Sequence, residues 1–482
     1  MRQAGGSGPG RSPSKPRRIA ARSKAPACPA RPVKAGLQRK DSPSSPGGSF
    51  DRLRIISPKR NGSPPTGWDG FFPYYAGYPE GFAREIITSV ALPPSAVVLD
   101  PWNGSGTTTY AASQLGLASQ GFDLNPVMIA VARARLLPPS EADTIDPLAR
   151  EISVHDPHTA RSVGADEPLS LWFEDATAAH MRALEAAIRK QLVGEMTLTS
   201  AGVRLDNLSG LAATFYVGLF AVARELAAPF RTTNPTWLRA PKEKEKRVAA
   251  PRKLIVSKFL KALHGMAEAL AARKKAPSGD QGQSSIALVD TTELALPPDS
   301  VDFVLTSPPY CTRIDYTAAT RVELAVMAPL THTVREELSA KMIGTIRVPQ
   351  RDVSADDSWG LRCKAFLEAV RTHPSKASEI YYYRTHLDYF DKLARSLRHI
   401  GGTLKNNGKA ILVVQDSYYK EIHNPLPAIV EDIASHCGLT LQRREDFYLN
   451  HSMTGINPHT RAYRQSQSVV ESVLCFKKNN PI

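Results

Sequence analysis

The sequence predicts an α/β fold with a mainly parallel sheet of seven strands, crossover helices and a mainly helical insertion. Apolar runs of strand length alternate with segments of helical length before residue 138 and again after residue 284. The stretch from 165 to 275 instead carries apolar residues at spacings of three and four, which is typical of helices. The last two apolar runs follow each other as a hairpin, so the final strand is expected to be reversed.

The boundaries of these elements follow from the apolar runs and from the residues that punctuate them. The seven expected strands span 95–100, 118–123, 285–290, 301–306, 409–416, 440–447 and 468–476. The expected helices span 107–116, 127–137, 175–192, 208–226, 252–275, 381–402 and 425–438.

The first three expected strands each end in a carboxylate. Asp100 ends the first strand, and a turn with Gly104 and Gly106 follows, in which the backbone can approach a ligand closely. Asp123 ends the second strand and is placed to accept hydrogen bonds from ribose hydroxyls. Asp290 ends the third strand and is a candidate acceptor for an adenine amino group. The carboxyl ends of parallel strands share one edge of a sheet, so these acids predict one ligand crevice.

The glycine turn does not match two common nucleotide-binding loops. A phosphate-binding loop carries Gly-Lys-Ser/Thr after its glycines, whereas threonines follow Gly106 here. The dinucleotide pattern has a third glycine, which is Thr109 in this chain. The turn therefore favours neither a nucleoside triphosphate nor a nicotinamide cofactor.

The fourth expected strand ends in Ser307-Pro308-Pro309-Tyr310, a turn suited to activating the amino group of a nucleobase. Such an amino group is a poor nucleophile until hydrogen-bond acceptors hold its protons. Proline has no backbone N–H and a fixed φ, so the turn is rigid and the carbonyls of Ser307 and Pro308 are free to point outward. Tyr310 offers a stacking face for a base taken out of its helix.

Together, these two motifs resemble those of the amino-methylating DNA methyltransferases. The glycine motif is Asp-Pro-Trp-Asn-Gly-Ser-Gly-Thr-Thr at 100–108, and the second is Thr-Ser-Pro-Pro-Tyr at 306–310. The resemblance implies a class I (Rossmann-like) methyltransferase fold with S-adenosyl-L-methionine as the cofactor. Ser307 is typical of the cytosine-N4 branch, whereas the adenine branch more often has Asp or Asn there. The segment 72–85 resembles the part of the family that covers the cofactor, and Trp102 replaces the usual Phe.

The resemblance assigns two groups of site residues. The catalytic group acts on the target base and consists of Ser307, Pro308, Pro309 and Tyr310. The cofactor-binding group consists of Asp100, Pro101, Asn103, Gly104, Gly106, Thr107, Asp123 and Asp290. No metal is implied: the five cysteines lack metal-binding spacing, and neither the His-x-Glu nor the Cys-x-x-Cys pattern of a zinc deaminase is present.

Composition and charge suggest four regions. Residues 1–65 carry fifteen Lys and Arg against two acidic residues, which accounts for most of the net charge of +15, and are rich in Pro, Ser and Gly, so we expect a disordered basic tail. Residues 66–137 form the expected cofactor-binding half, 138–284 a helical insertion suited to target recognition, and 285–482 the catalytic half. Without an apolar run of membrane length, we expect a cytoplasmic, nucleoid-associated protein that contacts no membrane.

Several alternatives remain open from the sequence. The same chemistry suits adenine N6 in DNA or an amino group in RNA, although no added RNA-binding domain is recognisable. A nucleic-acid binder without turnover is less expected, because a binder does not require both motifs together. Double-stranded DNA is the expected partner, and a cognate restriction enzyme is a further candidate. The recognition sequence and the oligomeric state do not follow from the sequence.

Overall fold

The computed structural model describes most of the chain from Phe50 onward, and all of these residues belong to one compact unit, Gly47–Ile482. The described residues are 50–59, 67–72, 77–154, 164–194, 198–199, 202–232, 237–243, 245–273, 282–312, 315–331, 335–348, 353–449 and 469–479. Most of the predicted basic tail, 1–65, lies outside them.

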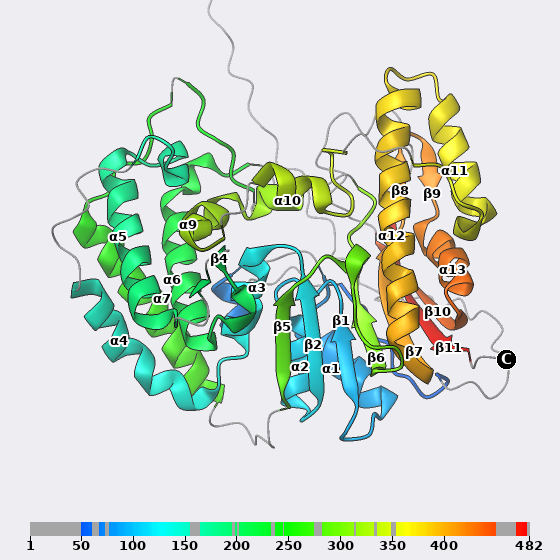
Figure 1. Ribbon diagram of the computed structural model, residues 1–482, viewed down its shortest axis with the longest axis horizontal. Coiled ribbons are helices and arrows are strands. Elements are labelled where there is room, and N and C mark those ends of the chain that lie inside the picture. Colours follow the sequence, from blue (N-terminus) through cyan, green and yellow to red (C-terminus); the bar gives the residue numbers. More distant parts are fainter. Residues whose placement is uncertain are drawn as a thin grey trace, which may run out of the picture. The chain divides into compact units, whose positions relative to one another are not determined.

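The centre of the fold is a seven-stranded sheet with the order β10-β11-β7-β6-β1-β2-β5 (Figure 1). β11 runs antiparallel to both of its neighbours, and every other pair in this sheet is parallel. The prediction of a mainly parallel seven-stranded sheet with a reversed final strand is confirmed. The strands are β1 (Val97–Asp100), β2 (Ala118–Asp123), β5 (Ser284–Leu288), β6 (Val301–Thr306), β7 (Leu404–Gln415), β10 (Leu439–Leu449) and β11 (Val469–Lys478).

The helices fall into three groups by the surface that they cover. α1 (Glu80–Val90) and α2 (Thr107–Gln114) pack on one face of the sheet. α11 (Gly360–Thr372), α12 (Tyr383–Thr403) and α13 (Leu426–His436) pack on the other face. Successive strand residues serve opposite faces: Val98 belongs to the first cluster and Leu99 to the second. Both faces of the central strands are therefore buried, as expected for parallel strands.

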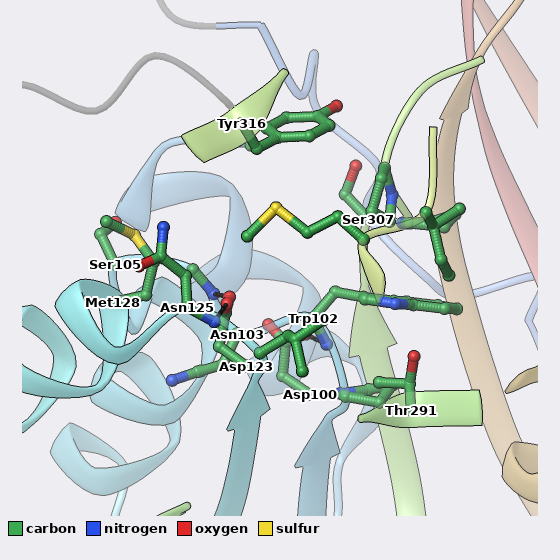
Figure 2. Close-up of a pocket in the computed structure, with 18 of the residues that line it drawn as sticks. Asp100, Trp102, Asn103, Ser105, Asp123, Asn125, Met128, Thr291, Ser307 and Tyr316 are labelled. Carbon is green, nitrogen blue, oxygen red and sulfur yellow. Dashed lines mark hydrogen bonds between the residues drawn. The ribbon is translucent and has the colours of Figure 1, made fainter. Parts of the chain in front are cut away.

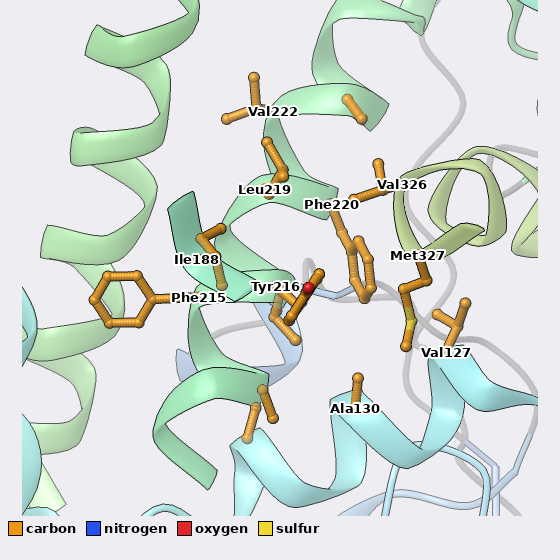
Figure 3. Packing of buried hydrophobic residues seen from close by; sticks show 14 of the residues in the cluster. Val127, Ala130, Ile188, Phe215, Tyr216, Leu219, Phe220, Val222, Val326 and Met327 are labelled. Carbon is orange, nitrogen blue, oxygen red and sulfur yellow. The ribbon is translucent and has the colours of Figure 1, made fainter. Parts of the chain in front are cut away.

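The third group of helices lies beyond the β5 edge of the sheet (Figure 1). It comprises α4 (Ala142–Val154), α5 (Asp175–Leu192), α6 (Gly210–Leu226) and α7 (Arg252–Arg273), with α3 (Pro126–Arg135) and α9 (Arg321–Thr331) packed against them. α6 is buried on nearly all sides, and Figure 3 shows Tyr216 and Phe220 lying among side chains of α3, α5 and α9. The predicted helical insertion thus shares one hydrophobic core with α3 and α9.

Short elements complete the described structure. They are α8 (Tyr316–Ala319), α10 (Arg335–Lys341) and the two-stranded ladders β3 (Leu198–Thr199) with β4 (Gly202–Val203) and β8 (Ser417–Tyr419) with β9 (Ile422–Asn424). None of the helices in the described ranges is long and apolar enough to cross a membrane.

Most predicted boundaries differ from the observed ones by a few residues, and two elements also differ in kind. The predicted Asn407-Gly408 turn lies within β7, which already begins at Leu404; Asn407 adopts a φ of +63°, and the register with β6 shifts just there, so the residues form an irregularity of the strand. The helix predicted from Tyr381 begins as a π-turn over Ser378–Tyr382, and α12 proper starts at Tyr383.

Residues 50–55 form a strap across the sheet face that α1 also covers. Phe50 and Leu53 are buried in the same cluster as Ile411 and Val413 of β7. Arg443 of β10 donates hydrogen bonds to the carbonyls of Phe50 and Leu53, at 3.1 and 2.8 Å. The strap therefore closes part of the core that the helices leave uncovered.

We predict that Phe50→Ala lowers the free energy of unfolding by about 3–5 kcal/mol, because it leaves a cavity over β7. The midpoint of urea unfolding measures this loss. Ile56→Ala is the matched control, since Ile56 is 36% exposed and should shift the midpoint little. Equal midpoints for the two variants would show that the strap contributes nothing to the core.

Candidate active site

The main pocket lies at the carboxyl ends of β1, β2, β5 and β6 (Figure 2). Parallel strands bring their carboxyl ends to one edge of the sheet, so the loops after these four strands meet there. Eleven of the predicted site residues line this pocket: Asp100, Pro101, Asn103, Gly104, Thr107, Asp123, Asp290, Ser307, Pro308, Pro309 and Tyr310. The structure thus brings the two predicted groups together in one cavity.

Gly106 is the predicted site residue that does not line the pocket. It caps the N-terminus of α2 with a φ of +80°, which favours glycine. A Cβ at this position would lie 2.9 Å from the Cβ of Ala132 in α3. The glycine therefore permits the close packing of α2 against α3.

The carboxylate of Asp100 is buried and accepts three hydrogen bonds from the protein. It accepts hydrogen bonds from the Thr306 hydroxyl at 2.6 Å, the Thr108 hydroxyl at 2.5 Å and the backbone N–H of Trp102 at 3.1 Å. Burial raises the pKa of Asp100 to about 6, and these donors oppose the shift because they favour the charged form. Asp100 thereby links the ends of β1 and β6 to the start of α2.

Tyr78 extends this network from the segment before α1. Its hydroxyl lies 2.6 Å from the Thr108 hydroxyl and donates to the Leu305 carbonyl at 3.2 Å. Burial, and then the nearby Asp100 carboxylate, raise the pKa of Tyr78 well above its usual value. Tyr78 belongs to the segment 72–85 that we expected to cover the cofactor, and it lines the pocket with Gly77; residues 73–76 lie outside the described part of the chain.

Asp123 organises the loop that follows β1. Its two carboxylate oxygens accept the backbone N–H of Gly104 at 3.0 Å and of Asn125 at 2.8 Å. Burial raises the pKa of Asp123 to about 6. A carboxylate has about four acceptor positions, so two remain for a ligand. Asn125 in turn caps α3 by accepting the Val127 N–H at 3.1 Å, as its sequence position predicts.

Asn103 presents a buried donor that has no partner among the described residues. Its Oδ1 accepts the Thr109 hydroxyl at 3.1 Å, while its Nδ2 is unpaired. The neighbouring Trp102 Nε1 is likewise buried without a partner in that part of the chain. Gly121 makes room for this arrangement, because a Cβ there would lie 2.6 Å from the Asn103 amide. Buried unpaired donors that line a pocket point to a ligand that accepts hydrogen bonds.

Asp290 lies in the loop after β5, the edge strand of the sheet. One of its carboxylate oxygens accepts the backbone N–H and the hydroxyl of Thr292, at 2.9 and 2.8 Å. These bonds fix the loop after β5, in which Val289 and Thr291 also line the pocket. Oδ2 of Asp290 has no partner among the hydrogen bonds of the described residues, so the carboxylate keeps an acceptor for a ligand.

The Ser307 hydroxyl can only accept hydrogen bonds from a ligand. Its single proton is donated to the Val413 carbonyl of β7 at 2.9 Å, which leaves oxygen lone pairs for the pocket. The carbonyl of Pro309 accepts the Tyr389 hydroxyl at 2.7 Å. No described residue donates to the carbonyls of Ser307 and Pro308, as the two prolines predict. The turn therefore gathers several acceptors and offers the pocket no side-chain donor from Ser307.

Both the side chain and the backbone of Tyr310 are fixed by hydrogen bonds. Its hydroxyl donates to Glu471 of β11 at 2.7 Å, and its backbone N–H donates to the Tyr316 hydroxyl at 3.1 Å. Burial, and then the Glu471 carboxylate, raise the pKa of Tyr310 well above its usual value, and burial raises that of Tyr316 to about 12. Both phenols are thus neutral at physiological pH. Figure 2 shows Tyr316 across the pocket from Asp100 and Trp102.

Other lining residues come from parts of the chain that sequence reasoning did not assign to the site. They are Ser105, Leu124, Met128, Thr320, Lys341, Met342 and Ile343. Tyr316 lies six residues after Tyr310, in the segment Asp315-Tyr316-Thr317. The segment around Met342 carries no motif that could have indicated its place. Among the described residues, no group of three His, Cys, Asp or Glu side chains could hold a metal ion.

Two sequence comparisons match this chain to DNA methyltransferases. Residues 38–134 match the model of the N6/N4 methyltransferase family, described as DNA methylase. The Type II methyltransferase M.BsoBI from Geobacillus stearothermophilus is 24% identical over 364 residues, which cover 72% of this chain and 68% of that protein.

Two solved structures align at low similarity. A SAM-dependent methyltransferase from Methanosarcina mazei aligns over 82% of this chain and 98% of its own, with 9% identity and a TM-score of 0.28. A candidate sarcosine dimethylglycine methyltransferase from Galdieria sulphuraria aligns over 84% of this chain and 86% of its own, with 8% identity and a TM-score of 0.29. The two motifs and these sequence matches support the amino-methylating DNA methyltransferase family for this chain.

Proposed function

We propose that this protein transfers a methyl group from S-adenosyl-L-methionine to the N4 amino group of cytosine in double-stranded DNA. The observation that carries the proposal is the set of acceptors at the catalytic turn. The Ser307 hydroxyl gives its proton to the Val413 carbonyl, and the carbonyls of Ser307 and Pro308 have no donor among the described residues. Such a site suits a ligand group with two protons to donate, which an exocyclic amino group provides.

S-adenosyl-L-methionine is the cofactor of this family, and the residues of the pocket fit it. The unpaired Nδ2 of Asn103 suits the carboxylate of the amino-acid part. Asp123 has acceptor positions left for ribose hydroxyls, and Asp290 keeps an acceptor for the adenine amino group. We assign Pro101, Gly104 and Thr107, which line the same end of the pocket, to the cofactor as well.

The chain's contribution to the reaction is to hold the target amino group in a reactive geometry. Acceptors at Ser307 and Pro308 fix the two amino protons, so that the nitrogen lone pair is less delocalised into the ring and points at the methyl donor. The bound cofactor supplies an electrophilic methyl group on a sulfonium. Tyr310 provides a face on which the extruded base stacks, and the carbonyl of Pro309 is occupied by Tyr389.

Cytosine is favoured over adenine by Ser307, since the cytosine-N4 branch typically carries Ser at this position. Adenine N6 presents the same two protons and remains the second candidate. An amino group in RNA would be held by the same acceptors, and DNA is favoured by the family match. The match to a Type II methyltransferase supports a cognate restriction enzyme as a partner. Target recognition by residues 138–284 and DNA contacts by the basic tail are further parts of the proposal.

We predict that purified protein transfers isotopic label from S-adenosyl-L-methionine to DNA as N4-methylcytosine. Mass spectrometry of nucleosides from DNA and from total RNA after incubation measures it. Label in N6-methyladenine would show that adenine is the target base. Label in RNA alone would show that RNA is the substrate. Cofactor binding without label in any substrate that contains varied sequences would contradict the proposed activity.

Ser307→Ala should lower kcat by about 100-fold while the dissociation constant of the cofactor stays within a factor of about two, because only the contact to the amino group is lost. Single-turnover methylation and calorimetry measure the two quantities. Ser300→Ala is the matched control: the Ser300 hydroxyl also donates to a carbonyl, Pro297, at 2.7 Å, but it is exposed just before β6 begins. A kcat equal to that of the control would remove Ser307 from the reaction.

Cofactor affinity should fall as the pH drops through about 6. The pKa of Asp100 and of Asp123 is raised to about 6, so both are ionised acceptors at pH 8 and become protonated below pH 6. Each proton that binding must displace weakens affinity by up to about tenfold per pH unit. Calorimetric titrations between pH 5 and 8 test this.

The variant Asp123→Asn tests whether Asp123 causes the pH dependence of cofactor affinity. The variant should bind the cofactor roughly 10- to 100-fold more weakly at pH 8, because a hydrogen bond to a charged acceptor is lost, and its pH dependence should be shallower. A dissociation constant for the natural protein that does not change between pH 5 and 8 would argue against an ionised Asp123 in the binding site.

A further inference from the structure

Helix α12 contains a buried pair of opposite charges, Asp388 and Lys392. Lys392 Nζ lies 2.8 Å from the Asp388 carboxylate, one helical turn away, and both side chains are only 4% exposed. Removing two charges from water costs about as much as their attraction returns, so a buried pair of this kind is weak evidence for stabilisation. The other contacts of the ammonium therefore indicate what the pair does.

The ammonium of Lys392 donates to the carbonyls of Ala340 and Met342, at 2.8 and 3.2 Å. With Asp388, these bonds use all three donors of the ammonium group. We call residues 340–344 the roof segment, because Met342 and Ile343 line the pocket together with the catalytic turn. A hydrophobic side chain at position 392 could pack there, but it could not hold two carbonyls.

Tyr389 joins the roof segment to the catalytic turn. Its hydroxyl donates to the Pro309 carbonyl at 2.7 Å, and the side chain is 1% exposed. Gly344 adopts a φ of +79°, and a Cβ there would lie 3.3 Å from the Tyr310 carbonyl and 3.8 Å from the Tyr389 ring. Lys392 and Tyr389, less than one turn apart on α12, thus contact the two walls of the cavity in which the target base would lie.

We propose that Asp388, Tyr389 and Lys392 are positioning residues that fix the roof segment over the catalytic turn and so set the approach of the target base to the methyl donor. The inference rests on the proposed function. α12 suits this task because it packs along one face of the sheet, and its Tyr389 reaches the Pro309 carbonyl beyond β6. Tyr389 also occupies the Pro309 carbonyl, so that the acceptors left at the turn are those of Ser307 and Pro308.

The test uses the double variant Asp388→Asn/Lys392→Met in the full chain. It removes both charges at once, keeps similar side-chain volumes and leaves no unpaired buried charge. We expect a folded protein with cofactor affinity within about twofold of the natural one and a kcat lower by about 10- to 100-fold, because small misplacement of reacting groups has effects of this size. Lys392→Met alone leaves Asp388 buried without its partner and should also unfold at lower denaturant concentration.

Two further measurements separate a positioning role from a structural one. Hydrogen exchange at amides 342–346 should speed up in the double variant, while amides of β6 and α13 keep their protection. Tyr389→Phe removes one hydroxyl and should lower kcat without weakening cofactor binding. Glu368→Gln/Arg371→Met removes a matched but exposed pair on α11 and is the control that should leave kcat, cofactor affinity and exchange unchanged.

The outcomes decide between clear alternatives. A folded double variant with natural kcat and natural exchange at 342–346 overturns the proposal and leaves the pair a structural feature. Faster exchange with lowered kcat supports it. If the natural protein binds the cofactor but labels no nucleic acid, the proposed function fails, and the exchange result alone still shows whether Lys392 holds the roof segment.

Discussion

The site depends on one buried carboxylate, that of Asp100. It lies where β1, β6 and α2 meet, and it accepts hydrogen bonds from Thr306, Thr108 and the backbone of Trp102. Thr306 directly precedes the catalytic turn, whereas Trp102 opens the glycine loop, so one carboxylate fixes the separation of the two motifs. Together with the pairing of β1 with β6, this link holds two loops that are about two hundred residues apart in the chain. Burial raises the pKa of Asp100 to about 6, so the carboxylate is ionised under physiological conditions.

The walls of the pocket are held from both sides by buried charges that contact backbone carbonyls. On the β5 side, Arg224 of α6 pairs with Glu323 of α9 and donates to the Ala319 carbonyl at 2.7 Å. This contact supports the turn that presents Tyr316 and Thr320 to the pocket. On the other side, Lys392 holds the roof segment. The helical insertion therefore serves as a scaffold for the catalytic wall, whatever part it also takes in target recognition.

Local sequence patterns predicted the sheet and the strand-end residues of the site well. Asp100, Asp123, Asp290 and Ser307 could be placed because each lies at or just after the end of an apolar strand, and parallel strands bring such positions together. The mainly parallel direction of the strands followed from the same alternation, and the reversal of the last strand followed from the hairpin. The helix over 175–192 was also predicted with its observed bounds, because its apolar residues keep a clear period.

The remaining parts could not be predicted because they depend on contacts between distant segments. Glu471 reaches Tyr310 across 161 positions of the chain, and Tyr389 reaches Pro309 across 80. Most such contacts join a side chain to a backbone carbonyl, which leaves no complementary residue pattern to recognise. The packing of Gly106 against Ala132 of α3 is another such contact that the sequence pattern did not indicate.

The proposed catalytic turn, residues 307–310, carries no charge, and the surrounding structure holds it in a fixed position. A carboxylate would attract an amino group that becomes positively charged during methyl transfer, whereas the Ser307 hydroxyl and two carbonyls offer only dipoles. Dipoles act over short distances and depend strongly on orientation, so their effect is lost if the base moves. Three hydrogen bonds fix the position of the turn: from Ser307 to Val413, from Tyr389 to Pro309 and from Tyr310 to Glu471. Positional rigidity thus takes the place of charge in the proposed reaction.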